Sequence, residues 1–193
     1  MICLWQYAFV AVAEGISISK AEARLTEEGY YLSADFDIQL SPPVETALNR
    51  GVTLYFVCEF AISRSRWYWM DTDISRDEQI AKLSFNALTR QYRISRGSLF
   101  QSFINLNDAL HVLGHQIAPP VPLASLEKKG GGYFSQLFKK GSECCSAFAQ
   151  MKLDVAQLPK PLQVNALTNE DWKLESEPHH WVIYPTMDEV EAE

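Results

Sequence analysis

The sequence predicts a mainly β protein that folds as an antiparallel β-sandwich, and three observations lead to that prediction. Several segments alternate apolar and polar residues, which is the pattern of strands with one buried face. Turn residues separate these segments at short intervals, and only two segments have the capping residues and periodicity of helices. Aromatic residues make up 12% of the 193 residues, which supplies a core and favours strands. A partly closed β-barrel is the alternative arrangement.

The first third of the chain predicts three strands and one helix. Ile16–Leu25 is a strand in which the apolar positions change parity near Ser19-Lys20, as they do at a β-bulge. Leu32–Leu40 shows the most regular alternation in the chain and is predicted as a half-buried strand. Ser41–Gly51 is predicted as a short helix, with serine as the N-cap and glycine at its end. Val52–Ile62 is apolar on both faces, which indicates a central strand.

The middle of the chain predicts a hairpin, a further strand and a second helix. Asp71-Thr72-Asp73 is expected to form a turn after an aromatic loop. Gln79–Phe85 and Gln91–Ile94 are predicted to pair as a hairpin, and Leu99–Phe103 follows as a short strand. Asn105–Gly114 has a capping asparagine and a row of leucines on one face, so a short amphipathic helix is expected there.

The last third begins with an irregular segment and then returns to strands. Ala118–Gly141 contains three prolines and three consecutive glycines and is predicted as a flexible excursion from the domain. Cys145–Val155 alternates again and is predicted as a long strand. Pro159–Pro161 is expected to be a stiff corner. Trp172–Leu174 and Trp181–Tyr184 are predicted to pair with each other around a short turn. Together these elements suggest an immunoglobulin-like β-sandwich with two short helices.

Charge and hydropathy limit the function classes. The net charge is −7, and four of the acids lie in the last six residues, so the rest of the chain carries −7 + 4 = −3. A body so close to neutral argues against a nucleic-acid surface. No apolar run approaches the roughly 20 residues that cross a bilayer, so no transmembrane segment is expected in the mature chain. We expect a single domain over residues 14–185 and a disordered acidic tail over residues 186–193.

The N-terminus resembles a secretory signal. Residues 1–12 are mostly apolar, and Ala11-Val12-Ala13 fits the small-x-small pattern of a cleavage site before Glu14. No lysine or arginine precedes Lys20, so the alternative is a buried first strand. The signal interpretation makes residues 1–13 a signal-peptide remnant and predicts export to the periplasm. In that oxidising compartment Cys58 is expected to form a disulfide with Cys145 or with its neighbour Cys144.

No catalytic or metal-binding motif stands out. Asp35 and Asp37 share the polar face of one strand about 7 Å apart, as a pair of acid–base carboxylates would, but a solvated sheet face is the preferred interpretation. His111 and His115 are four residues apart, but they lie on either side of Gly114, the predicted end of a helix, and lack an E-x-x-H or H-E-x-x-H arrangement. Cys58 lies on the apolar side of its strand, where a thiol is ordinarily inert. We therefore expect no catalytic residue, no metal and no cofactor.

The best candidate for binding is a basic and aromatic stretch in the middle of the chain. Seven bases against four acids lie between Arg64 and Arg96, interleaved with aromatic residues. Arginine and tryptophan contribute strongly to interfaces, and arginine stacks on aromatic rings. The alternative is ordinary cross-strand pairing on a sheet. The residues of this candidate binding surface are Arg64, Arg66, Trp67, Trp69, Arg90, Tyr92 and Arg93.

Several stretches resemble a known family. The run AEGISISKAEARLTEEGYYLSADFDIQLSPPVETALNRGVTLYFVCEF, then RWYW, LSFNALTRQYRIS and LDVAQLPKPLQVNAL, is similar to the proteobacterial domain-of-unknown-function family 4390 over Ala13–Tyr184. The resemblance implies an exported protein without an assigned activity, encoded near an envelope nitrogen-sensing kinase pair. A membrane sensor kinase is thus an implied partner. The segment Ala118–Gly141 is longer and less regular than the family pattern.

These observations lead to an expected function. The chain is expected to be an exported, non-enzymatic interaction or accessory module of the bacterial envelope. The alternative is a periplasmic small-ligand-binding or hydrolytic protein, with its site between the Trp67/Trp69 loop and the Pro159–Pro161 corner. A flat aromatic patch would favour the first hypothesis, and a deep cleft with converging polar groups would favour the second.

Overall fold

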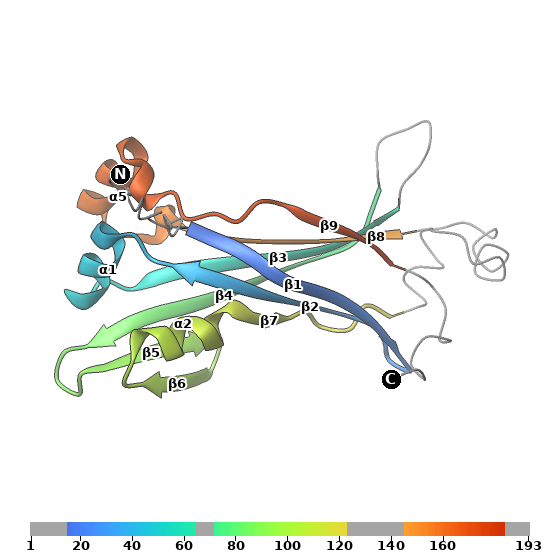
Figure 1. Cartoon of the computed structure of the whole chain (residues 1–193), viewed down its shortest axis with the longest axis horizontal. Helices are drawn as coiled ribbons and strands as arrows, with labels where there is room; N and C mark the ends of the chain where they lie inside the picture. The colour runs from blue at the N-terminus through green and yellow to red at the C-terminus, as the bar shows by residue number, and fades with distance from the viewer. Residues whose placement is uncertain (1–14, 65–71, 123–144, 184–193) are drawn as a thin grey trace, which may run out of the picture.

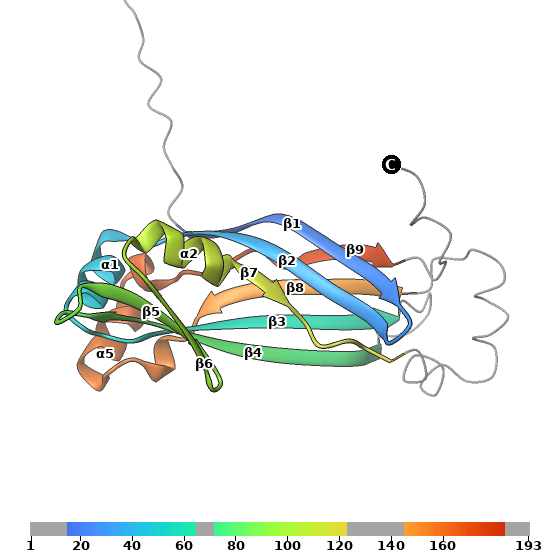
Figure 2. The same ribbon diagram turned by 90° about the horizontal axis from the view of Figure 1, so that it is seen from below.

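The strands form two antiparallel sheets packed face to face, as the computed structural model shows for residues 15–64, 72–122 and 145–183 (Figures 1 and 2). The small sheet has the order β1-β2-β7, and the large sheet has the order β6-β5-β4-β3-β8-β9. The predicted mainly β sandwich is confirmed, and the described strands do not close into a barrel. The strands are β1 (Gly15–Thr26), β2 (Gly29–Gln39), β3 (Leu54–Arg64), β4 (Thr72–Asn86), β5 (Gln91–Arg96), β6 (Leu99–Phe103), β7 (His115–Ile117), β8 (Cys145–Leu153) and β9 (His179–Ile183).

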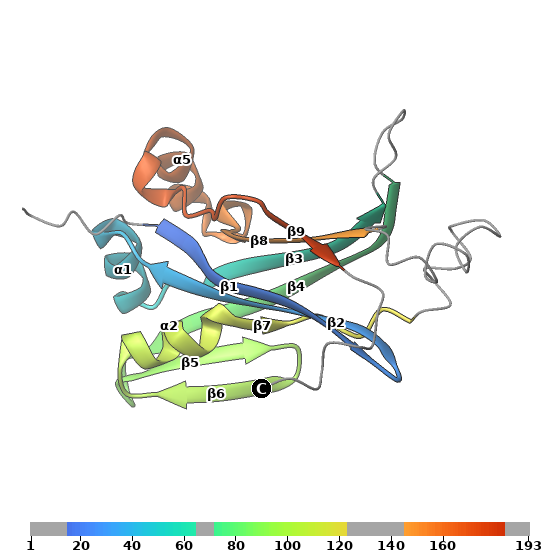
Figure 3. The ribbon, with the colours of Figure 1, turned by 45° about the vertical axis from the view of Figure 1, so that its right-hand side comes forward.

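The described residues hold three α-helices rather than the expected two. They are α1 (Pro42–Asn49), α2 (Leu106–Gly114) and α5 (Lys160–Thr168), and two short 3₁₀ helices are η1 (Val155–Gln157) and η2 (Glu170–Trp172). Helices α1 and α5 lie at the same end of the sandwich (Figure 1). Helix α2 packs against β2 and β5, so it bridges the two sheets along one open side (Figure 3).

The core lies between the two sheets and follows the alternation of the sequence. Residues of β2, β3 and β8 that share one parity point inward, whereas their neighbours point to solvent or to the sheet surface. The predicted bulge of the first strand is confirmed, because the register of β1 against β2 shifts between Ile18 and Lys20. The most completely buried core side chains are Leu32, Val44, Leu48, Leu54, Phe56, Cys58, Phe60, Ile62, Leu83, Leu113 and Met151.

Strand β4 is longer than predicted. Thr72 and Asp73, expected in a turn, are part of this strand and pair with the end of β3. The register of β3 against β4 shifts near Ile62, so the alternation of β4 is interrupted there. Asp77 and Gln79 then continue the inward row of β4, with the Gln79 amide donating to Asp77 and to the Ile117 carbonyl. Because residues on the inward face of this half of β4 are polar, the alternation of apolar and polar residues that predicts a strand is absent there.

The predicted C-terminal hairpin is wrong. Trp172 belongs to η2, and the backbone of the next residues runs along β8, where the Leu153 N–H donates to the Leu174 carbonyl. Strand β9 pairs with the other half of β8, so the two segments follow each other along one edge of β8. Pro159–Pro161, predicted as a corner, instead leads into α5, because proline is compatible with the first turn of a helix.

The predicted disulfide between Cys58 and Cys145 is also wrong in this fold. Cys58 lies opposite Met151 on the neighbouring strand. Cys145 is six residues from Met151 along β8, which corresponds to about 20 Å in a strand. A disulfide needs Cα atoms roughly 4.4–6.8 Å apart, so these two residues cannot be bridged. The other predicted partner, Cys144, lies outside the described residues.

Candidate functional site

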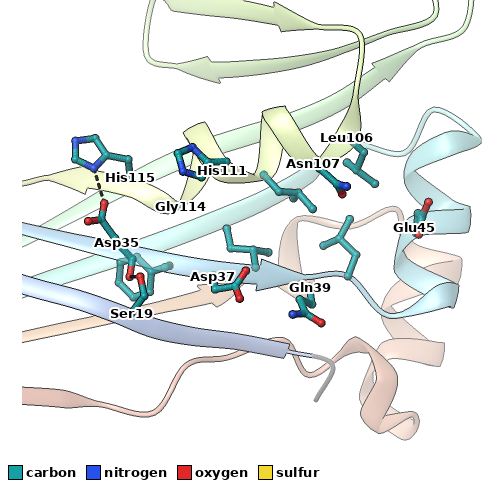
Figure 4. A pocket seen from close by; sticks show the side chains of 14 residues that line it. Ser19, Asp35, Asp37, Gln39, Glu45, Leu106, Asn107, His111, Gly114 and His115 are labelled. Atoms are coloured by element: carbon teal, nitrogen blue, oxygen red, sulfur yellow. Dashed lines mark hydrogen bonds and ion pairs between the residues drawn. The ribbon is translucent and has the colours of Figure 1, made fainter. Parts of the chain in front are cut away.

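An open groove of about 840 Å³ lies between the outer side of β2 and helix α2. Figure 4 shows Asp35, Asp37 and Gln39 in succession along β2, with His111 and His115 across from them and Glu45 of α1 at one end. The groove therefore collects residues from β1, β2, α1, α2 and β7. Its lining consists of Ser19, Asp35, Phe36, Asp37, Ile38, Gln39, Leu40, Glu45, Leu106, Asn107, Leu110, His111, Gly114 and His115.

The alternation of β2 creates one wall of the groove. Phe36 and Ile38 point into the core and are 4% and 5% exposed, so Asp35, Asp37 and Gln39 necessarily point to the opposite face. These are the residues that the sequence analysis assigned to a solvated strand face. The structure places them along a concave surface, because α2 lies beside the strand rather than far from it.

Gly114 sets how closely α2 approaches β2. A Cβ atom at this position would overlap the carbonyl oxygen of Phe36. The sequence analysis interpreted this glycine as the end of the helix, and α2 does end there. Gly114 therefore also allows α2 to pack closely against β2, because only glycine leaves room for the strand backbone.

Asp35 and His115 form a hydrogen-bonded pair at the edge of the groove. The His115 Nδ1 atom lies 2.6 Å from Asp35 Oδ1, and the two side chains are 55% and 44% exposed. Ser19 lies on the opposite side of the aspartate, where its hydroxyl donates to the Asp35 backbone carbonyl over 3.0 Å. In a nucleophilic triad the histidine stands between the acid and the serine. Here the acid occupies the middle strand, so these three residues do not form that arrangement.

The groove combines negative charge with an apolar wall. Its lining contains three carboxylates, from Asp35, Asp37 and Glu45, and no lysine or arginine. The apolar part of the lining includes three leucines, the half-buried Leu40 and Leu106 and the buried Leu110. Asp35 is paired with His115, whereas Asp37 and Glu45 form no ion pair among the described residues. An aliphatic surface beside these two carboxylates suits a ligand that carries both positive charge and apolar groups.

Arg96 of β5 holds the end of α2 in place. Its Nη2 atom donates to the carbonyls of Val112 at 2.8 Å, Leu113 at 3.3 Å and His115 at 3.1 Å. These carbonyls lack helical partners because α2 passes directly into β7. Burial lowers the pKa of the Arg96 guanidinium. The sequence analysis counted Arg96 only as one of several bases, and nothing in the sequence signals that it faces inward.

The thiol of Cys58 lies in the core on the other side of β2 and takes no part in the groove. Its side chain is 2% exposed, and burial, together with the charge of Asp77, raises its pKa. The described residues contain no group of three or more histidine, cysteine or acidic side chains arranged to hold a metal ion. No helix in the described part of the chain is both long and apolar enough to cross a membrane.

Comparison with known proteins identifies the family. The family model for a domain of unknown function, DUF4390, matches residues 13–182. The chain belongs to this family. The predicted resemblance is thereby confirmed, and it covers all the residues of the groove. No curated protein and no solved structure matches the chain.

In this DUF4390 domain, the predicted binding surface does not form one surface. Arg64 pairs with Thr72 and Arg93 pairs with Ser84, so they lie twelve residues apart along β4, roughly 40 Å. Arg93 is on the outer face of the large sheet, with its guanidinium 4.5 Å from the centre of the Phe100 ring. Arg66, Trp67 and Trp69 lie outside the described residues.

The other two members of that prediction lie on the inner side of β5 and in the turn before that strand. Tyr92 is on the inner side of β5, where its hydroxyl donates to Asn49 Oδ1 at 2.9 Å and its ring packs against Phe85. Burial and the nearby Glu45 raise the pKa of Tyr92. Arg90 has a φ of 54° at the hairpin turn between β4 and β5. Residues that are close in sequence need not share a surface, because successive residues of a strand face opposite sides of the sheet.

The alternative site predicted for a ligand or substrate is also divided. Trp67 and Trp69 of that site lie outside the described residues. Arg64 and Thr72, the described residues on either side of them in the sequence, pair at one end of the β3–β4 ladder. The opposite end of β3 lies near η1, because the Asp154 N–H donates to the Tyr55 carbonyl. Pro159 follows η1 closely along the chain, so this corner lies near the end of β3 opposite to Arg64 and Thr72. The groove residues were missed as a set because Asp35 and His115 are 80 residues apart.

Proposed function

We propose that this DUF4390 domain is a non-enzymatic binding module that holds a cationic segment of another envelope protein in the groove between β2 and α2. The observation that carries the proposal is the composition of the groove, which has three carboxylates, no lysine or arginine, and a wall of leucines. A segment that alternates lysine or arginine with apolar residues matches both features. The groove is partly open to solvent, which suits an extended chain segment better than an enclosed small molecule.

Export to the periplasm is part of the proposal. It is supported by the apolar N-terminal residues and the small-x-small sequence before Glu14. The intact mass of the native protein from fractionated cells tests it. A periplasmic species that starts at Glu14 supports export, whereas a cytoplasmic species that retains Met1 contradicts it. Among possible partners, a membrane sensor kinase is the first to test by crosslinking from the groove in cells.

Binding of defined peptides tests the groove directly. The probe is a short fluorescent peptide of alternating lysine and leucine, and its counterpart alternates glutamate and leucine. Binding is followed by fluorescence anisotropy at low and at physiological salt. We expect the cationic peptide to bind and the anionic peptide to bind far more weakly, and salt to weaken the cationic complex.

A matched pair of double variants separates the groove from the general charge of the protein. D37N combined with E45Q removes two carboxylates from the groove. E27Q combined with E28Q removes the same charge in the turn between β1 and β2. We expect the first variant to weaken binding roughly tenfold and the second to leave it nearly unchanged. Equal effects of the two variants, or equally tight binding of the anionic peptide, would refute the proposal.

A further inference from the structure

The last strand of the large sheet, β6, is an exposed edge. It pairs with β5 on one side, and no described strand pairs with its other side. Four of its five residues are exposed, including Leu99 at 75% and Phe100 at 63%, and Ile104 directly after it is 77% exposed. An edge of this kind presents unpaired backbone N–H and C=O groups beside apolar side chains, which is a template for adding another strand.

The opposite edge of the sandwich shows how this chain protects a strand. Strand β1 is the edge of the small sheet, and it carries Lys20, Glu22 and Arg24. Lys20 Nζ lies 2.5 Å and Arg24 Nη2 lies 3.0 Å from the Glu22 carboxylate, and the hydrogen bond from Lys20 lowers the pKa of Glu22. Charged side chains on an edge discourage pairing with another chain. Strand β6, with the sequence LFQSF, has no charge and no proline.

We propose that β6 pairs with β6 of a second copy of this chain, in an antiparallel arrangement with twofold symmetry centred on Gln101. In this register Gln101 lies opposite Gln101 of the other copy, and Leu99 lies opposite Phe103. The pairing places two uncharged strands together and continues the large sheet across both molecules. No change in the described fold is needed, because β6 lies at the outer edge of the sheet (Figures 1 and 3).

The charges near the edge allow this association. The nearest exposed base on the outer face of the sheet is Arg93, which belongs to β5, and its guanidinium lies over the Phe100 ring. In the dimer the two β5 strands are three strand spacings apart, about 14 Å, which exceeds the screening length of roughly 8 Å at physiological salt. The five-residue strand makes a small interface, so a dissociation constant in the micromolar range is expected.

Disulfide trapping tests both the partner and the register. Directly opposed residues of an antiparallel pair have Cα atoms about 4.5–5.5 Å apart, which is within the range of a disulfide. Gln101→Cys should therefore form a covalent dimer rapidly under mild oxidation. The matched control is Leu99→Cys, because the two substituted positions would be about 14 Å apart in the same dimer. The wild-type protein under the same oxidant gives the background from its native cysteines.

Sedimentation velocity over a micromolar concentration series tests the association without a crosslink. We expect a reversible monomer–dimer equilibrium for the wild type and a monomer for Gln101→Lys, in which two like charges would lie face to face. Circular dichroism confirms that the exposed substitution leaves the fold intact. The proposal is overturned if the wild type stays monomeric throughout, if Gln101→Lys dimerises equally well, or if Leu99→Cys crosslinks as fast as Gln101→Cys.

Discussion

Replacing Arg96 by alanine is expected to destabilise the fold by about 2 kcal/mol, because this side chain is the partner of the carbonyls at the end of α2. One guanidinium nitrogen lies within 3.3 Å of three carbonyl oxygens. A hydrogen bond from a charged donor contributes about 1.5–3 kcal/mol, but one NH₂ group has only two hydrogens to share among the three acceptors. The favourable charge at a helix C-terminus adds to this contribution.

The cost of burial reduces that total. Burial lowers the pKa of Arg96, which shows that its charged form is partly desolvated, and its Nε has no hydrogen-bond partner among the described residues. Removing the side chain relieves this cost but takes the Arg96 donor from the Val112 and His115 carbonyls, whereas the Leu113 carbonyl still accepts from the Gln116 amide. A net loss of about 2 kcal/mol follows, which corresponds to a fall of about 4–8 °C in Tm for a domain of this size.

Urea unfolding followed by circular dichroism measures the change, and hydrogen exchange locates it in α2. The matched control is Arg93→Ala, on the same strand but on the outer face, where the loss of its contact with the exposed Phe100 ring should cost less than about 1 kcal/mol. Arg96→Lys should fall between the two, because it keeps the charge but loses the planar donor geometry. If Arg96→Ala and Arg93→Ala destabilise equally, the role given to Arg96 is wrong.

Three further predictions follow from single contacts. Gly114→Ala should cost about 2 kcal/mol in urea unfolding, because its Cβ would overlap the Phe36 carbonyl, and an unchanged stability would contradict that close approach. Cys58, buried and with a raised pKa, should react with a maleimide at least roughly 100-fold more slowly in the folded protein than in urea. Glu22→Gln should lose less than about 1 kcal/mol at neutral pH, measured by urea unfolding across pH. Because folding lowers the pKa of Glu22, that loss should disappear as the pH falls below the ordinary value of 4.5, and a loss that persists in acid would exclude the ion pairs as its cause.

Local patterns in the sequence predicted most strands and two helices. The alternation of Leu32–Leu40 predicted β2 apart from its first three residues, and the change of parity near Ser19 located the bulge of β1. Each of these signals arises within a single strand that has one buried face and one more polar face. Helix α2 was also predicted well, because the spacing of its leucines and its capping residues indicate the same helix bounds.

The secondary-structure predictions were wrong where a strand face carries both polar and apolar residues, or where pairing depends on distant parts of the chain. The inward row of β4 contains Asp77 and Gln79, so the strand has no clean alternation over that half. The segment from Trp172 to Leu174 was predicted to pair with β9, although both lie against β8. Which of two neighbouring strands a segment joins depends on long-range packing, and a local pattern carries no information about it.

The candidate site was the least predictable part of the molecule. Asp35 and His115 were both considered from the sequence, but no local pattern indicates that β7 brings the histidine beside β2. The basic and aromatic residues were predicted as the binding surface because they are close in sequence. In the structure, the described members of that set lie far apart on the large sheet. A site assembled across strands can be found only from the strand order, which the sequence of one protein does not contain.

The contacts around the end of α2 connect the stability of the fold to the proposed binding. Arg96 lies outside the groove, yet it fixes the carbonyls on both sides of Gly114, which is part of the groove lining. If α2 forms one wall of a peptide site, loosening its end must also weaken peptide binding. Arg96→Ala is therefore expected to reduce the affinity for the cationic peptide under conditions where the protein is still folded. If affinity is unchanged while hydrogen exchange shows a loosened α2, then α2 is not a wall of that site, and binding must depend on β2 and α1 alone.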